Sequence, residues 1–179
     1  ATRGEEPTAR SRCRRSASPI SPETTTTSRA AASASARAAG VLHGTPWVAR
    51  LTGTADLLTG PGDRLVPSHR DLHDKQILHL EGAAPGLLDV DTATWGDPAL
   101  DLGNLRAHAL WRERQGVWSA ARADVVRRTV DELALAEGLP APRVGLYEYA
   151  TLLRLRCVYA LRPRYAETAR ALETELTQR

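Results

Sequence analysis

The dipeptide Asp97-Pro98 separates two parts of the chain that differ in periodicity. Aspartate followed by proline is typical of a helix start, because the carboxylate caps free N–H groups and proline fits the first turn. Beyond this point apolar residues recur at helical spacing. The sequence therefore predicts helices that begin at Pro98, that span 119–137 and 143–161, and that begin again at Pro163. Val126, Val130 and Leu133 are expected on the buried face of the second.

Strand signals lie before this dipeptide. Two short aliphatic runs, 77–80 and 87–90, flank a turn rich in glycine and proline over 82–86, which predicts a β-hairpin. No strand is predicted beyond Asp91, and a helix is expected over 48–59. The predicted fold class is α+β and mostly helical, a small hairpin followed by a helical bundle.

Residues 1–36 differ from the remainder of the 179-residue chain. They consist mainly of Arg, Ser, Thr, Ala and Pro, with Ile20 as their large aliphatic residue. Such a segment buries too little apolar surface to offset its conformational entropy. We therefore expect 1–36 to be a disordered or low-complexity tail and 37–179 to form the folded domain.

Composition excludes several classes of protein. The net charge of +3 is concentrated in residues 1–40, which hold seven arginines and three acidic residues. No basic patch with interleaved aromatics is evident, so a nucleic-acid partner is not expected. No apolar run is long enough to span a membrane, and no apolar segment typical of a secretory signal follows the N-terminus. Cys13 and Cys157 have neither zinc-site nor disulfide-framework spacing, which favours a cytoplasmic setting. The oligomeric state cannot be predicted.

The stretch HRDLHDKQIL, residues 69–78, carries the candidate chemistry. Phosphoryl transfer requires a carboxylate near the acceptor hydroxyl and hard oxygen ligands for Mg²⁺. Asp71 and Gln76 lie in this stretch, and the predicted hairpin returns Asp89 close to them. Asp91 would share a face with Asp89 if that segment were extended.

These residues resemble a known group of enzymes. HxDLHxxQIL, followed by LLDxDxxxxGDPxxDLxNL over 87–105, is similar to the aminoglycoside phosphotransferase and choline kinase family, which has a protein-kinase-like fold. The match is strong over roughly 65–110, while beyond it only the helical character fits. The resemblance implies the C-terminal lobe of such a fold, with the metal site carried by the hairpin.

The resemblance also implies roles for individual residues. Asp71 would be the catalytic base or would orient the acceptor hydroxyl. Gln76 and Asp89 would bind Mg²⁺ and, through it, ATP. Asp91 would be a further metal ligand or a hydrogen-bonding partner of the loop. Asp101 would be structural and would hold the loop from the following helix. Independently of the resemblance, His69 is expected to form hydrogen bonds in the loop and Asp97 to cap the helix, so both give structural support.

Two departures from the family pattern bear on activity. Gln76 stands where asparagine is usual. The single lysine, Lys75, lies inside the catalytic loop, and neither a glycine-rich phosphate loop nor a lysine-bearing sheet precedes it. We therefore expect the N-terminal lobe to be absent, truncated or replaced.

The predicted function is ATP-dependent phosphoryl transfer to the hydroxyl of a small molecule that the sequence does not identify. Two alternatives remain open. One is a non-catalytic pseudokinase fragment or binding module. The other is a metal-dependent hydrolase built on His69, His73, Asp89 and Asp91.

The remaining polar residues receive structural interpretations. His43 and His108 are expected to be structural, and His79 is expected to be a satisfied or surface histidine rather than a ligand. Four arginines are expected to form a solvated helix face with their aliphatic stems packed on apolar neighbours, namely Arg154, Arg156, Arg162 and Arg164.

Overall fold

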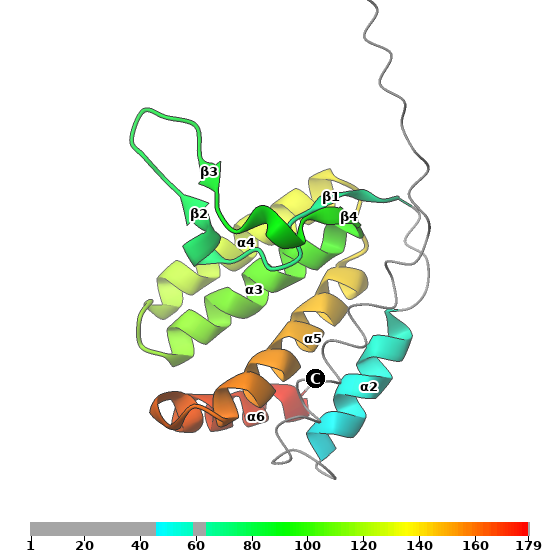
Figure 1. The fold of residues 1–179 in the computed structure, drawn as a ribbon, viewed down its shortest axis with the longest axis vertical. Coiled ribbons are helices and arrows are strands. Elements are labelled where there is room, and N and C mark those ends of the chain that lie inside the picture. The colour runs from blue at the N-terminus through cyan, green and yellow to red at the C-terminus, as the bar shows by residue number, and fades with distance from the viewer. Residues whose placement is uncertain (1–45, 59–63, 179) are drawn as a thin grey trace, which may run out of the picture.

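The computed structural model describes residues 46–58 and 64–178 (Figure 1). The predicted tail 1–36 lies outside the described residues, so its state stays a prediction. The helices are α2 (Pro46–Leu57), α3 (Pro98–Arg114), α4 (Ala120–Ala136), α5 (Ala141–Ala160) and α6 (Ala166–Gln178). The strands are β1 (Val66–Ser68), β2 (Ile77–Leu78), β3 (Gly86–Leu87) and β4 (Thr94–Gly96). Short 3₁₀ helices are η1 (Asp74–Gln76), η2 (Val90–Thr92) and η3 (Pro163–Tyr165).

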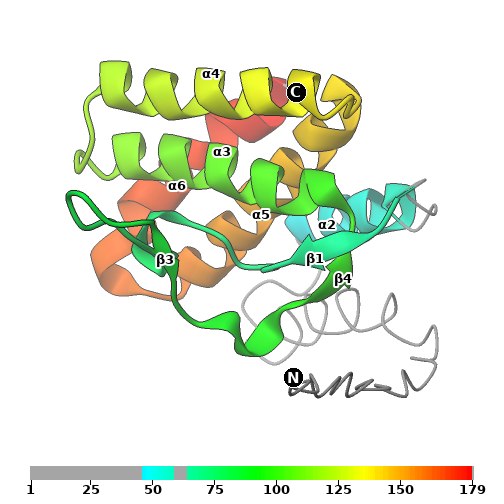
Figure 2. The ribbon, with the colours of Figure 1, turned by 90° about the horizontal axis from the view of Figure 1, so that it is seen from above.

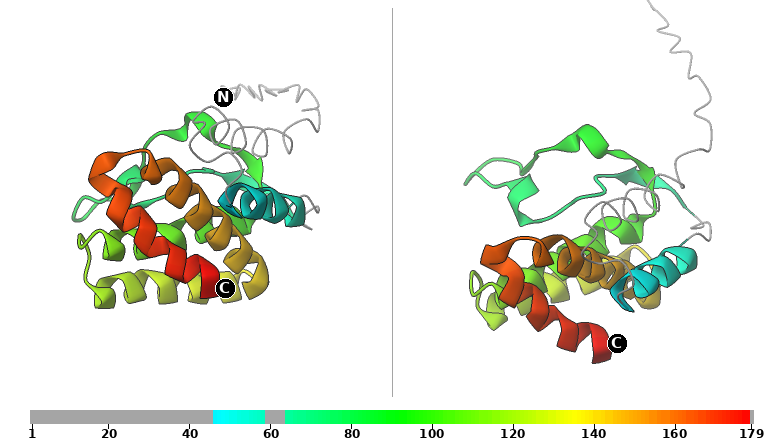
Figure 3. Two further views of the ribbon diagram at one scale, coloured as in Figure 1. Left: turned by 90° about the horizontal axis from the view of Figure 1, so that it is seen from below. Right: turned by 60° about the horizontal axis from the view of Figure 1, so that its bottom comes forward.

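The helices form a bundle in which α3 and α5 are central. Helix α3 packs on α4 and α5, and α5 also packs on α2 and α6. The strands and α6 lie on opposite sides of this bundle (Figures 1 and 3). The predicted mostly helical α+β fold is therefore confirmed. None of the described helices is long and apolar enough to cross a membrane.

The helix boundaries follow local signals. Asp97 caps α3, with Pro98 in its first turn, and Ser119 caps α4. Gly138, with φ of 68°, follows α4 in the left-handed conformation that glycine adopts without steric cost. The helix expected over 48–59 is α2, which begins two residues earlier than expected.

Small and aromatic residues set the packing around α3. A Cβ atom added to Gly103 would lie 2.5 Å from the Cβ of Tyr147, so glycine is what allows α5 to approach α3 this closely. Trp111 is fully buried and stacks on Tyr159, with ring centroids 4.6 Å apart. Further core residues of this cluster are Leu110, Leu152, Leu153, Leu155, Leu172 and Leu176.

The expectation for α4 is partly wrong. Val130 is buried, but Leu133 is 48% exposed, and Ala134 is buried in its place. Helix α4 packs closely against α3, and this contact buries small residues. Leu133 lies to the side, where it lines an open hollow beside β1 with Pro67.

The predicted hairpin is present but short. Strands β2 and β3 are antiparallel, with Ile77 opposite Leu87. The expectation that strands end at Asp91 is wrong, because β4 pairs antiparallel with β1, with Pro67 opposite Trp95. The sequence did not reveal β4 because three residues are too few to show alternating apolar and polar side chains, and because its partner β1 lies far away in sequence. As Figure 2 shows, the segment from β1 to β4 runs along one side of α3.

Candidate active site

The loop after β1 is held by the start of α3. Arg70 has φ of 72°, a left-handed conformation that is costly for a residue with a side chain. The carboxylate of Asp101 accepts hydrogen bonds from the backbone N–H groups of His69 (2.7 Å) and Arg70 (2.8 Å). Asn104, one turn further along α3, donates from Nδ2 to the Arg70 carbonyl at 2.9 Å. These bonds hold the strained backbone immediately before Asp71.

His69 connects this loop to the hairpin segment. Its buried imidazole donates from Nε2 to the carbonyl of Leu88 at 2.7 Å, and its own carbonyl accepts from the Thr92 hydroxyl at 3.0 Å. The residues on either side of Asp89 are therefore tied to the residues just before Asp71.

Gln76 and Asp89 meet across the two segments. Gln76 donates from Nε2 to Oδ2 of Asp89 at 3.1 Å. Asp89 adopts a left-handed conformation, with φ of 55° and ψ of 47°. Rotation of the Gln76 amide would turn its oxygen toward Asp89, which would create a pair of oxygen donors. Asp89 is solvent-exposed.

The premise used for Asp91 is wrong. The segment after Asp89 is not extended, because η2 begins at Val90. Asp91 lies within that 3₁₀ turn and is solvent-exposed, so the alternation of a strand does not place it beside Asp89. Its role as a metal ligand stays a prediction without geometric support.

Asp71 has a partner that the sequence did not indicate. Arg154, on α5, donates from Nη2 to Oδ1 of Asp71 at 2.9 Å. Both side chains are partly exposed, 41% for Arg154 and 38% for Asp71. The interpretation of Arg154 as part of a solvated face is therefore incomplete, since it forms an ion pair inside the candidate site. Asp71 remains partly open to solvent.

Asp97 supports the start of α3. One carboxylate oxygen accepts from the Ala99 N–H at 2.9 Å, and the other binds Arg143 and the hydroxyl of Tyr147. Burial raises the pKa of Tyr147 to about 12, and the nearby Asp97 charge acts in the same direction. Asp97 therefore anchors α5 to the start of the helix that carries Asp101.

Sequence reasoning also missed a buried polar group beneath the loop. Arg112, on α3, binds both carboxylate oxygens of Asp74, at 2.9–3.0 Å. His73 stacks on His108 of α3. Sequence spacing gives no direct signal for these contacts, because the loop contributes Asp74 and His73 while the partners come from a distant helix.

The hydrolase alternative lacks its expected cluster. Within the part of the chain that the structure describes, the His, Cys, Asp and Glu side chains close enough to share a metal ion are His73, Asp74 and His108. His69 is engaged with Leu88, and neither Asp89 nor Asp91 belongs to that group.

A comparison with protein-family models assigns the chain to a family of phosphotransferases. The model of a family described as "Phosphotransferase enzyme family" matches residues 7–139, most of the chain. The match includes the loop, the hairpin and α3, and it begins inside the segment 1–36. No protein in the curated set matches the sequence.

Similar solved structures share the fold. Glucosamine kinase in one crystal form has 19% identity and a TM-score of 0.60, over 86% of this chain and 45% of that one. Glucosamine kinase in complex with glucosamine, ADP and inorganic phosphate has 20% identity and a TM-score of 0.56, over 86% and 47%. The chain spans less than half the length of these proteins. At this identity the likeness establishes a kinase-like fold.

Proposed function

Because the chain belongs to the phosphotransferase enzyme family, we propose that it carries the catalytic loop and metal-binding residues of an ATP-dependent small-molecule kinase. The observation that carries this proposal is the contact between Gln76 and Asp89, 3.1 Å long. It joins two motif residues from separate segments, while Asp101 and His69 hold the backbone immediately before Asp71.

The donor set fits magnesium. Mg²⁺ binds hard oxygen ligands and is often held by one or two protein groups, with phosphates and water completing its coordination. The Gln76 amide and the Asp89 carboxylate offer such oxygens from a partly solvated position. When bound there, the ion would neutralise charge on the ATP phosphates. Gln76 and Asp89 would hold it, and the Leu88–His69 bond would keep Asp89 in register with the loop.

Apolar side chains next to this pair suit a nucleotide base. Ile77, Leu78 and Leu87 of the hairpin are 38%, 53% and 55% exposed, and Leu88 is 43% exposed. Exposed aliphatic groups beside a phosphate-binding pair could cover one face of an adenine ring. ADP in one of the similar solved kinases is consistent with nucleotide use by this fold.

Asp71 would accept the hydrogen bond and then the proton of the acceptor hydroxyl. The hydroxyl oxygen would form the new bond to the γ-phosphorus, and the bond from that phosphorus to the bridging oxygen would break to release ADP. Arg154 would hold the Asp71 carboxylate in place from α5, 2.9 Å away. A positioned base of this kind contributes about 10²–10⁴-fold in rate.

The acceptor is a small molecule with a hydroxyl group. Glucosamine in one similar solved structure makes amino sugars the first acceptors to test, followed by neutral sugars, choline-like alcohols and aminoglycosides. The side chains that would choose among them are not specified by the fold, because one fold supports many substrates.

The test is phosphoryl transfer followed by ³¹P NMR with Mg–ATP and this panel of acceptors. Asp71→Asn should lower turnover by about 10²–10⁴-fold with nucleotide binding retained. Asp124→Asn, the same change on the exposed surface of α4, is the matched control and should leave turnover unchanged.

Wild-type turnover by Asp71→Asn would contradict the role of Asp71. Nucleotide binding by the wild-type chain without transfer to any acceptor would favour the non-catalytic alternative.

A further inference from the structure

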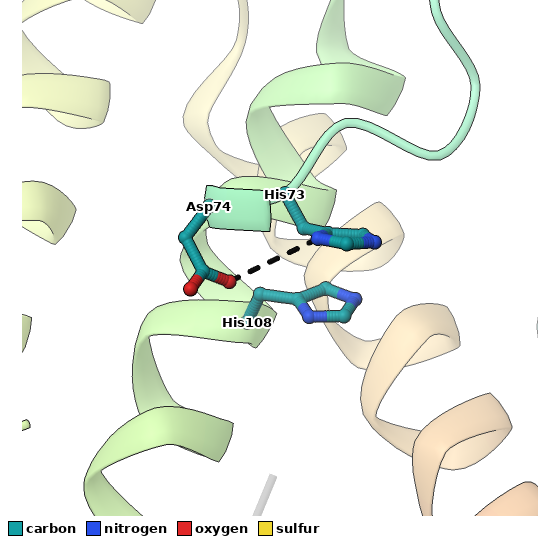
Figure 4. Close-up of side chains that lie close together, drawn as sticks. All are labelled: His73, Asp74 and His108. Carbon is teal, nitrogen blue, oxygen red and sulfur yellow. Dashed lines mark ion pairs between the residues drawn. The ribbon is translucent and has the colours of Figure 1, made fainter. Parts of the chain in front are cut away.

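His73, Asp74 and His108 form a cluster between the catalytic loop and α3 (Figure 4). One ligand atom from each lies within 4.8 Å of the others. The two imidazole rings stack, with centroids 4.6 Å apart and planes inclined by 21°. Nδ1 of His73 is 3.8 Å from Oδ1 of Asp74, the contact drawn in Figure 4. Two imidazoles and a carboxylate therefore lie close together between the loop and α3.

His108 lacks partners that its burial would require. The residue is 8% exposed, and neither Nδ1 nor Nε2 of its side chain has a hydrogen-bond partner. Burying a polar group without such a partner costs about 1–3 kcal/mol in proteins, and most buried polar atoms are satisfied. The nitrogens of His108 are therefore available to a ligand.

The charge state of both histidines suits metal binding. Burial lowers the pKa of His108 to about 3, and the neighbouring His73 acts in the same direction. Burial also lowers the pKa of His73, against the opposing charges of Asp71 and Asp74. A lowered pKa favours the neutral imidazole, which is the form that binds a metal ion.

We propose that His73, Asp74 and His108 bind a divalent transition metal ion of the zinc class, which fastens the catalytic loop to α3. Neutral imidazole is a preferred ligand of zinc, whereas Mg²⁺ prefers oxygen. The site is therefore distinct in chemistry and in residues from the Gln76–Asp89 pair. The fourth position would be filled by water.

The cluster must contract to bind the ion. Zinc–nitrogen bonds are about 2.0–2.1 Å long, so the ligand atoms must approach and the stacked rings must tilt. The hydrogen bond from the Lys75 N–H to Nδ1 of His73, 3.2 Å long, would be exchanged for the metal bond. Arg112 would remain on Asp74 and orient its carboxylate, as outer partners of metal ligands do.

The ion would also act on Asp71. With Nδ1 of His73 on the metal, Nε2 must carry the proton, and Nε2 lies 3.9 Å from Oδ2 of Asp71. A hydrogen bond across this gap, formed as the ring tilts, would complete a carboxylate–histidine–metal chain, which fixes the histidine tautomer. Zinc would thus orient Asp71 together with Arg154. The metal site itself does not depend on the proposed kinase function.

The test is calorimetric titration of the full chain, without a polyhistidine tag, with Zn²⁺. Cys13→Ser is used as the background to remove a competing thiol. His108→Phe keeps a stacked ring and removes both nitrogens, whereas His79→Phe makes the same change at an exposed histidine. We expect one zinc ion per chain, at least ~100-fold weaker binding in His108→Phe, and unchanged binding in His79→Phe. Equal binding by His108→Phe and the background chain would overturn the proposal.

A second experiment uses only the Cys13→Ser chain, so its result does not depend on whether His108→Phe folds. Imidazole ¹⁵N shifts, followed by NMR during zinc addition, should change for His73 and His108 and not for His79. No binding of zinc by the folded chain, or shifts confined to His79 or His43, would overturn the proposal. Addition of Mg²⁺ should leave the shifts of His73 and His108 unchanged.

Discussion

Removal of the Asp101 carboxylate should destabilise the whole domain. Asp101 accepts two hydrogen bonds, from the backbone N–H groups of His69 and Arg70, at 2.7 and 2.8 Å. Hydrogen bonds to charged groups contribute about 1.5–3 kcal/mol each, and water can reach this partly buried site, so we expect Asp101→Ala to cost about 3 kcal/mol. Asp101→Asn keeps one acceptor oxygen and should cost about half as much.

The measurement is urea denaturation followed by far-UV circular dichroism. In a protein of this size about 3 kcal/mol corresponds to a fall in Tm of roughly 6–12 °C. Asp124→Ala, on the exposed surface of α4, is the control and should stay within about 0.5 kcal/mol of wild type. A cost for Asp101→Ala no larger than that of the control would refute the role of Asp101 as the anchor of the loop.

Three further predictions concern packing, strain and pH. Gly103→Ala should cost about 1–3 kcal/mol in urea denaturation, because its Cβ would lie 2.5 Å from the Cβ of Tyr147, while Gly145→Ala, with open space around it, should be neutral or stabilising; equal effects would contradict the close approach. Arg70→Gly should stabilise the fold by up to about 1 kcal/mol by relieving the positive φ of 72°, and a loss of Tm would contradict this reasoning. Burial lowers the pKa of His108 from 6.5 to about 3, so between these pH values the unfolded chain binds more protons than the folded chain. With EDTA present, the free energy of unfolding should therefore fall by up to about 1.4 kcal/mol for each pH unit between 6.5 and 3. His108→Phe should flatten this dependence, and an unchanged slope would exclude His108 as its source.

Local signals predicted the helices well. The start of α3 at Asp97-Pro98 and the helix expected over 119–137 were predicted from signals that depend on neighbours within one turn. The β2–β3 hairpin has the same character, because its turn lies between its strands.

Features that depend on distant partners could not be predicted in this way. Strand β4 exists because it pairs with β1, and neither strand is long enough to show alternation. Arg154 reaches Asp71 from a helix 83 residues further along the chain. From the sequence alone, Arg154 could not be told from an arginine on the solvent-exposed face of a helix. Only the packing of α5 on α3 brings it to the loop.

The candidate site was predicted in part, because some of its features depend on local signals and others on distant partners. The spacing of Asp71, Gln76 and Asp89 indicated phosphoryl transfer, and the structure places Gln76 and Asp89 in contact. The premise for Asp91 was wrong because Asp89 has a left-handed backbone and a 3₁₀ turn begins at Val90, so this segment is not extended.

The central claim is that Gln76 and Asp89 bind a magnesium–nucleotide complex, and calorimetric titration of the chain with ATP tests it most directly. The account predicts binding that requires Mg²⁺, that Asp89→Ala abolishes, and that Asp124→Ala leaves intact. Binding that is independent of Mg²⁺, binding that survives in Asp89→Ala, or no binding by the folded wild-type chain would contradict it.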